Sequence, residues 1–260
     1  MDSESGFLTD LEDLGDLTDL TDPTDTRSAI NTADHVLDRA VAASLEGYHA
    51  RFARRHGQAL RYENDVAPFF AIDDAQDPAA WDDAAELAEG GETVVFPGVT
   101  TWSPESSSAW ELIAKLDGVQ MVGTEVSPKP DPEAVRLGPD DVPEILDLIS
   151  RTEPGPFLPR TIELGTYLGV RHDGALIAMA GERMRPPGWT EISAVCTDPA
   201  YRGRGLAGRL VRAVAAGIVE RGETPFLHAV SANVNAIRLY EELGFRLRKS
   251  TVFSAARVPA

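Results

Sequence analysis

Residues 190–207, TEISAVCTDPAYRGRGLA, decide how the rest of the chain is organised. The stretch begins with apolar and β-branched residues, ends in two Arg-Gly pairs at residues 202–205, and leads into a long helical pattern. That order predicts a strand, a glycine-rich turn and a helix N-terminus. The first N–H groups of a helix lack intrahelical partners, and the helix dipole favours negative charge there. Glycines allow close backbone approach, so the stretch predicts a phosphate or pyrophosphate site.

The spacing excludes two common phosphate loops. The chain has no Gly-x-x-x-x-Gly-Lys-Ser/Thr at this place, and Gly203-x-Gly205 is followed by Ala207 without the third glycine of a dinucleotide fingerprint. A different phosphate-binding arrangement is therefore expected.

A second motif follows one strand–helix unit later. Residues 202–207 read Arg-x-x-Gly-x-Ala, and residues 233–245, NVNAIRLYEELGF, read Asn-x-x-Ala-x-x-Leu-Tyr-x-x-x-Gly-Phe. With both motifs in this order, the chain resembles the GCN5-related N-acetyltransferase (GNAT) superfamily. It is similar to bacterial members that have an FR47-like catalytic half and an additional N-terminal domain.

Composition narrows the classes of partner. The chain of 260 residues has a net charge of −18 and a pI near 4.6, which disfavours nucleic-acid and anionic-membrane binding. A single cysteine excludes an intramolecular disulfide and a cysteine-based metal site. No stretch approaches the length of a membrane span, and the acidic N-terminus does not match a secretory signal. We expect a cytoplasmic protein without a metal, acting as a monomer or homodimer.

Residues 1–30 form an acidic tail. Nine acidic residues and one arginine give it a net charge of −8, and its leucines recur every three residues, which makes no helical stripe. The tail is predicted to be disordered, or to be a short helix that docks on a partner.

Residues 31–127 predict an N-terminal α/β domain. A 3.6-residue periodicity indicates a helix from Ala33 to Arg54, and a second helix is expected from Ser106 to Leu116. The remaining patterns predict an extended run at 67–72, a helix at 79–89, and strands at 92–96 and 119–126. The alternation permits a degenerate copy of a GNAT-like fold, but both motifs are missing.

Residues 128–132 are a Pro-rich linker, in which prolines prevent a helix or a central strand. Residues 133–260 then alternate in a β-α-α-β-β-β-α-β-α-β-β order, with a hairpin over residues 172–174 and a terminal hairpin over 245–258. The resemblance implies an α+β mixed-sheet GNAT fold for this half, the catalytic domain.

The resemblance also implies a site for acetyl-CoA. It places the pyrophosphate at the turn, donors to the thioester carbonyl on a bulged central strand, and a pantetheine contact at the N-cap of the last helix. In this sequence those positions are Val195, Cys196, Thr197, Arg202, Gly203, Arg204, Gly205, Leu206, Ala207 and Asn233.

Two residues are candidates for proton transfer. Tyr240 lies two helical turns after Asn233 and is the expected general acid, although packing in the core also explains it. His228 stands five residues before Asn233, where many relatives have a glutamate, and a histidine accepts protons near neutral pH. A water held by Glu191 or Glu182 is the alternative base.

The function indicated is transfer of an acetyl group from acetyl-CoA to a primary amine of a small metabolite or peptide, directly within a ternary complex. A covalent route through Cys196 is less favoured because no base is assigned beside it. Contacts to the acceptor are expected from loops 152–160 and 185–189, including Phe157 and Trp189. The alternative function is a non-catalytic acyl-CoA-binding module that regulates a partner.

Overall fold

An eight-stranded mixed sheet forms the centre of the computed structural model, which describes residues 35–99, 102 and 109–258. Its order is β4-β11-β5-β10-β9-β8-β7-β6, and only β9 and β10 are parallel neighbours. The strands are β4 (Thr93–Pro97), β5 (Glu111–Val122), β6 (Val135–Leu137), β7 (Tyr167–His172), β8 (Ala175–Glu182), β9 (Trp189–Thr197), β10 (Thr224–Val230) and β11 (Arg246–Arg257). The acidic tail predicted at residues 1–30 lies outside the described residues.

Helices cover both faces of the sheet in the second half. Helix α3 (Val142–Thr152) packs against one apolar cluster of the sheet, whereas α4 (Leu206–Glu220) and α5 (Val234–Glu242) pack against another. Helix α4 connects the parallel strands β9 and β10, because such a pair needs a crossover. Short 3₁₀ helices complete this half: η4 (Pro139–Asp141), η5 (Thr161–Leu164) and η6 (Pro199–Tyr201). The α+β architecture predicted for this half is confirmed as far as residue 244.

A smaller three-stranded antiparallel sheet and one longer helix lie in the first half. Strand β2 lies between β1 and β3, and α2 packs beside them. The elements are η2 (Val36–Arg39), α1 (Ala40–Leu45), η3 (Ala50–Phe52), β1 (Ala53–His56), β2 (Ala59–Tyr62), β3 (Phe70–Ile72) and α2 (Pro78–Leu87).

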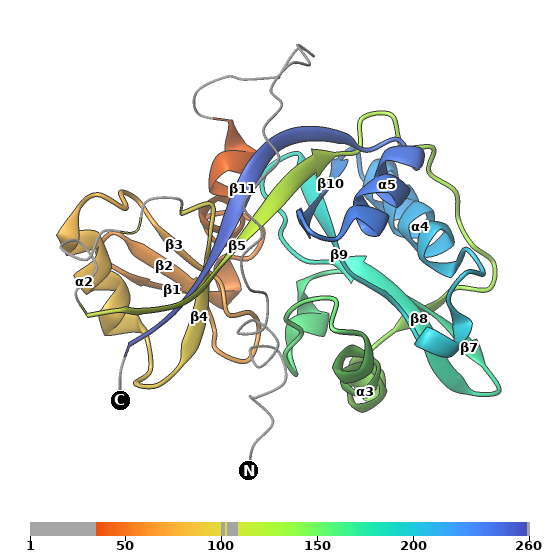
Figure 1. The fold of residues 1–260 in the computed structure, drawn as a ribbon, viewed down its shortest axis with the longest axis horizontal. Helices are drawn as coiled ribbons and strands as arrows, with labels where there is room; N and C mark the ends of the chain where they lie inside the picture. The colour runs from red at the N-terminus through yellow and green to blue at the C-terminus, as the bar shows by residue number, and fades with distance from the viewer. Residues whose placement is uncertain (1–34, 100–101, 103–108, 259–260) are drawn as a thin grey trace.

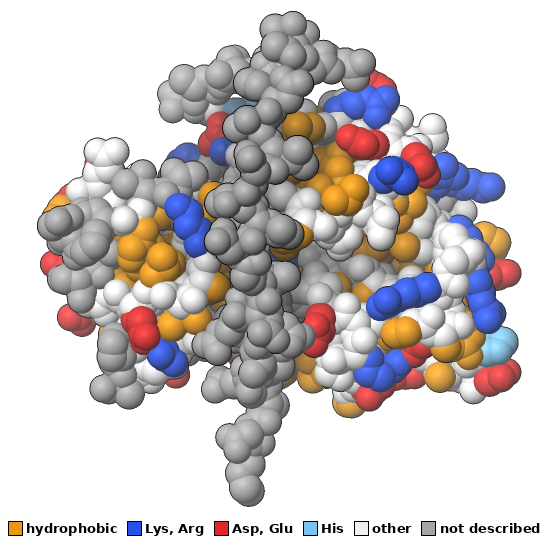
Figure 2. Space-filling model, in the orientation of Figure 1, with side chains coloured by type: hydrophobic (Ala, Val, Ile, Leu, Met, Phe, Trp, Pro, Cys, Tyr) orange, Lys and Arg blue, Asp and Glu red, His pale blue; other side chains and the backbone are white. Residues whose placement is uncertain are grey.

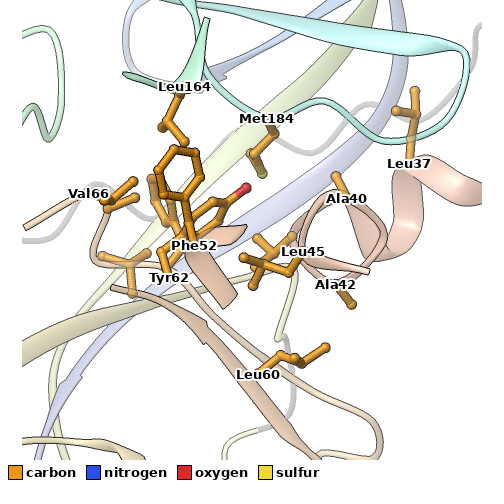
Figure 3. Packing of buried hydrophobic residues seen from close by; sticks show 14 of the residues in the cluster. Leu37, Ala40, Ala42, Leu45, Phe52, Leu60, Tyr62, Val66, Leu164 and Met184 are labelled. Carbon is orange, nitrogen blue, oxygen red and sulfur yellow. The ribbon is translucent and has the colours of Figure 1, made fainter. Parts of the chain in front are cut away.

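The two halves share the large sheet and an apolar core. Strand β5, before the Pro-rich segment, lies between β10 and β11, and β4 pairs with β11. Figure 1 shows the long strands β5 and β11 running from the part with α2 to the part with α4 and α5. Figure 3 shows Leu164 and Met184 of the second half pointing toward Phe52 and Tyr62 of the first. The division at 128–132 stays a prediction, and strands from both sides of it pair in the one large sheet.

The helix predicted from Ala33 to Arg54 is wrong. The described part of it is divided into η2, α1 and η3, and its last residues belong to β1. The chain turns at Gly47, where a Cβ would lie 3.0 Å from the carbonyl oxygen of Ala43. The apolar residues enter one core from several short pieces, so they mimic the period of a single helix.

Two further predictions fail at β5 and β11. Residues 111–116 of the expected second helix belong to β5, which pairs with β11 over its full length. The expected terminal hairpin is one strand of 12 residues, bent at register shifts near Leu247 and near Ala255. No Gly, Pro, Asn or Asp interrupts residues 246–257, so the segment lacks the strongest turn-forming residues. Pairing between distant segments decided both outcomes.

Candidate active site

A β-bulge in β9 lies beside the place where β9 and β10 separate. Met179 of β8 pairs with Cys196 and Gly181 pairs with Ser193, so β9 holds one extra residue there, and Ala194 has a positive φ of 52°. The parallel pairing of β9 with β10 ends at Glu191 and Phe226, although both strands continue. Beyond Glu191, the edge of β9 toward β10 has no ladder partner among the described residues. Its backbone groups therefore remain available to a ligand.

The glycine-rich turn lies at the end of the same strand. Gly203 and Gly205 have φ values of 76° and 74°, and a Cβ on either would meet nothing within 4 Å. Gly205 is the N-cap of α4, and Leu206 anchors the helix in the core while the turn itself is exposed. The described residues offer no backbone carbonyl to the N–H groups of 203–208. The turn therefore presents unpaired donors at a positive helix end.

Two arginines add charge to this turn. The Nε of Arg202 donates to the carbonyl oxygen of Thr197 at 3.2 Å, and the guanidinium of Arg204 lies 4.8 Å from the ring centroid of Tyr201. Figure 2 shows that, on the face in view, Lys and Arg side chains lie mostly over the half that contains α3, α4 and α5. This distribution suits an anionic ligand despite the negative charge of the whole chain.

Asn233 and Tyr240 occupy the beginning and the second turn of α5. The Oδ1 of Asn233 accepts from the N–H of Ala236 at 3.1 Å, which is the N-cap role, and its amide NH₂ has no partner among the described residues. Tyr240 is buried with its ring 6.0 Å from that of Phe245. Burial, together with the nearby Cys196 thiol, raises the pKa of Tyr240 to about 12, so the phenol keeps its proton at neutral pH.

Cys196 lies in a different environment from Tyr240. Its side chain belongs to the core that α3 covers, together with Ile145 and Leu148. Burial raises the pKa of its thiol to about 11. Since the thiolate is the nucleophile, this environment opposes a covalent acyl-enzyme route.

His228 lies at the centre of a buried hydrogen-bond network. Its Nδ1 is 2.8 Å from Oε1 of Glu191 on β9, and its Nε2 is 3.0 Å from Nε2 of Gln120 on β5. Arg183 binds both oxygens of Glu191, at 2.8 and 2.7 Å. Burial alone would raise the pKa of Glu191, but the charge and hydrogen bonds of Arg183 and His228 lower it to about 2. Glu191 is thus a permanent carboxylate beside the imidazole.

The network continues from Gln120 to the first half of the chain. Arg248 donates to Oε1 of Gln120 at 2.7 Å and also binds Asp38 on η2, while Nε2 of Gln120 donates to the carbonyl oxygen of Leu37 at 2.9 Å. Gln120, Arg183 and Arg248 were not predicted as members of this site. No local motif marks them, because they meet only through strand pairing.

A cavity of about 400 Å³ opens above His228. Its walls come from both halves of the chain, and His228 and Gln120 lie in its lining. The segments that line it are residues 35 and 37–42, 70–76 and 97–99, with Gln120, Met184, His228, Lys249 and Thr251.

Several predicted contacts lie elsewhere. Phe157 packs in the core with its ring 5.3 Å from that of Tyr167, and Trp189 packs edge-on to His35, so neither is a wall of this cavity. The oxygens of Glu182 bind Arg221 and the N–H of Thr166, away from His228. Among the residues described, there is no cluster of three or more His, Cys, Asp and Glu side chains able to hold a metal ion. Within the same residues, no helix is both long and apolar enough to cross a membrane.

A bulged strand that separates from a parallel neighbour, followed by a glycine turn and a helix, defines an acyl-CoA-binding N-acyltransferase fold. The family model described as FR47-like protein matches residues 167–254, which contain the bulge, the turn and Tyr240. A crystal structure assigned to a GNAT-family acetyltransferase from Novosphingobium aromaticivorans DSM 12444 is 40% identical. The match covers 87% of this chain and 100% of that one, with a TM-score of 0.80. The chain therefore belongs to the GNAT family of acetyltransferases.

Two further relatives match this chain over a shorter stretch or at lower identity. N-alpha-acetyltransferase RimI from Mycobacterium tuberculosis (strain ATCC 25618 / H37Rv) is 36% identical over 83 residues, which are 31% of this chain and 51% of RimI. The match thus spans about half the length of that curated relative. A GCN5-related N-acetyltransferase from Kribbella flavida, at 17% identity and a TM-score of 0.56, shares the fold over 88% of this chain and 97% of its own.

Proposed function

We propose that this chain transfers the acetyl group of acetyl-CoA directly to a primary amine of a small metabolite or peptide. The observation that carries the proposal is the position of His228, a base in the lining of the cavity, beside the separation of β9 and β10. The acceptor would enter from the cavity and the thioester from the gap beyond Glu191. These two approaches would meet within one ternary complex.

The turn and the strand edge would hold the donor. The N–H groups of residues 203–207, with Arg202 and Arg204, would bind the pyrophosphate, as helix N-termini bind anions. Backbone groups of Val195, Cys196 and Thr197 would bind the thioester end, and the free amide of Asn233 would bind pantetheine.

Each proton in the reaction has a donor and an acceptor. His228 takes one proton from the acceptor ammonium, and the neutral amine attacks the thioester carbonyl carbon. As the new C–N bond forms and the C–S bond breaks, Tyr240 gives its phenolic proton to the departing thiolate. The second proton of the amine returns to the Tyr240 oxygen, and His228 releases its proton to water.

The alternative, an acyl-CoA-binding module without catalysis, predicts a site without a base facing the acceptor. The position of His228 in the cavity lining favours the enzyme. Both functions predict binding of acetyl-CoA, so binding alone does not separate them.

Calorimetric titration with acetyl-CoA and with pantetheine, followed by a thiol-release screen over a panel of amines, tests the proposal. We expect binding that requires the pyrophosphate, and thiol release with at least one amine. His228→Gln should lower that release by about 100-fold, the usual contribution of a general base. Binding without release from any amine would support the regulatory module, and no binding would refute both.

A further inference from the structure

The ring of His228 is held on every side. On β5, Gln120 is its direct cross-strand partner, and on β9 Glu191 forms the last ladder pair before the strands separate. The rings of Phe226 and Phe253 each lie edge-on to the imidazole with centroids 5.7 Å away. The side chain of His228 is only 6% exposed. The imidazole therefore has one orientation, with one nitrogen toward Glu191 and the other toward Gln120.

The partners of Gln120 determine which nitrogen of His228 carries the proton. A guanidinium only donates, so the Gln120 atom bound by Arg248 is the amide oxygen; a carbonyl only accepts, so the atom bound to Leu37 is the amide nitrogen. That NH₂ group is the one 3.0 Å from Nε2 of His228. Because an amide NH₂ donates, Nε2 must be the acceptor. The proton of the neutral ring is then on Nδ1, which donates to Glu191.

Glu191 has no capacity left to act as a base or to hold a water. Its Oε1 accepts from Arg183 and His228, and its Oε2 accepts from Arg183 and from the N–H of Met184. Its side chain is 0% exposed. The carboxylate is saturated by hydrogen bonds, and its lowered pKa keeps it ionised.

We propose that Glu191 is a positioning residue for His228. Together with the Gln120 amide, it holds the Nδ1–H tautomer, so that the Nε2 lone pair lies on the side of Gln120 in the lining of the acceptor cavity, and its negative charge stabilises the imidazolium formed on proton uptake. This inference rests on the proposed function, in which His228 is the base. It also assigns Gln120 a part, since the acceptor ammonium must replace the Gln120 amide as the donor to Nε2.

Other charged groups near the imidazole are separated from it by these two partners or lie at the rim of the cavity. They are Arg183 between β8 and β9, Asp38, Arg39 and His35 at η2, Asp73 and Asp74 after β3, and Arg248 and Lys249 on β11. Asp38 pairs with both Arg248 and Lys249, which limits the net field at the ring. Glu191 remains the one charged group in direct contact with His228 among the described residues.

The tautomer is measured without any substrate. Long-range ¹H–¹⁵N spectra of the full chain distinguish protonated from unprotonated ring nitrogens, and His228→Gln identifies the signals among the five histidines. We expect Nε2 of His228 unprotonated and Nδ1 protonated near pH 8. In Glu191→Gln this preference should weaken but not vanish, because the neutral amide stabilises the Nδ1–H group less than a carboxylate does, while the Gln120 amide still donates to Nε2. A wild-type spectrum with the proton on Nε2 would overturn the inference.

Kinetics test the charge of Glu191. Glu191→Gln should lower kcat by about 10- to 100-fold and move the acidic limb of the pH–rate profile to lower pH by about one unit, since the imidazolium loses its partner. The KM for acetyl-CoA should stay within about twofold. Glu191→Asp, which keeps the charge, should recover part of kcat. The matched control is Glu182→Gln, a buried carboxylate on the neighbouring strand whose arginine partner is Arg221.

The outcomes separate the inference from the proposed function. An unshifted pH profile in Glu191→Gln, with normal folding by circular dichroism, would refute the positioning role. If Glu191→Gln fails to fold because Arg183 is left buried, the wild-type tautomer and Glu191→Asp still decide. Thiol release from no amine, together with the expected tautomer, would refute the proposed function and leave the assignment of the proton intact.

Discussion

The turn at residues 198–207, the proposed donor site, and the cavity above His228, the proposed acceptor site, are built in opposite ways. The turn comes from one continuous stretch, and its properties follow from glycine conformation and a helix end. The cavity is lined by several segments from both halves of the chain, which meet only after the large sheet has formed. A site of the first kind is visible in a sequence, whereas a site of the second kind depends on the whole topology. Different perturbations should therefore separate the two.

Removing the hydroxyl group of Tyr240 should have the largest effect on the rate of acetyl transfer. Tyr240→Phe keeps the packing against Phe245 and removes the proton for the leaving thiolate, so kcat should fall by about 10²–10³-fold with little change in acetyl-CoA affinity. Steady-state kinetics and calorimetry measure the two quantities. Tyr167→Phe is the matched control, because Tyr167 is also buried and its hydroxyl has no partner in the structure. Equal kcat in both variants would show that Tyr240 serves only the core.

A strained turn should weaken donor binding without affecting the acceptor side. Gly205→Val forces a β-branched residue to a φ of 74°, at a cost of about 1–3 kcal/mol, and displaces the N–H groups at the helix end. We expect the Kd for acetyl-CoA to rise by about 10- to 100-fold. Gly222→Val provides the control, since Gly222 has a φ of 76° and equally open surroundings at the other end of α4. It should lose similar stability and keep its affinity.

Filling the cavity should weaken binding of the amine without affecting binding of acetyl-CoA. Ala75 lines the cavity between β3 and α2, and Ala75→Phe should raise the KM for the amine by about tenfold while the Kd for acetyl-CoA stays constant. Ala79→Phe places the same ring on an exposed position of α2 and should change neither constant. A change in acetyl-CoA affinity with Ala75→Phe would mean that the donor occupies this cavity.

The sequence was informative where local chemistry determines the structure. The strand, turn and helix around residues 190–220 and the capped helix after Asn233 were predicted correctly. Each has its own hydrophobic periodicity and its own residues that start or end the element. The family resemblance singled out His228, which stands where many relatives have a glutamate, but it did not indicate the partners of His228. Gln120 lies in β5, whose first residues read as a helix in isolation, and its contact with His228 exists only because β5 pairs with β10. Periodicity does not report which distant strand will be the neighbour.

A third feature is the joint between the first and second halves of the chain, formed where His49 meets Tyr62 and Leu164, and it contains a buried histidine. His49, between α1 and η3, lies 2.9 Å from the hydroxyl of Tyr62 and 3.0 Å from the carbonyl oxygen of Leu164 in η5. The carbonyl accepts from Nε2–H, and the hydroxyl donates to Nδ1, so the neutral ring satisfies both. Burial lowers the pKa of His49 to about 4.

Acidification should therefore loosen this joint modestly. The pKa of His49 is lower in the folded chain than the ordinary value of 6.5, so the unfolded chain binds more protons between those values and stability falls as pH decreases through that window. From pH 7.5 to 5.5 we expect a loss of roughly 1 kcal/mol from this group in urea-unfolding experiments. His49→Gln should be less stable at pH 7.5 but should lack this component of the pH dependence. His56→Gln, at a histidine half-exposed on β1, should retain it. An identical pH dependence in His49→Gln and the wild type would show that the joint does not depend on a neutral His49.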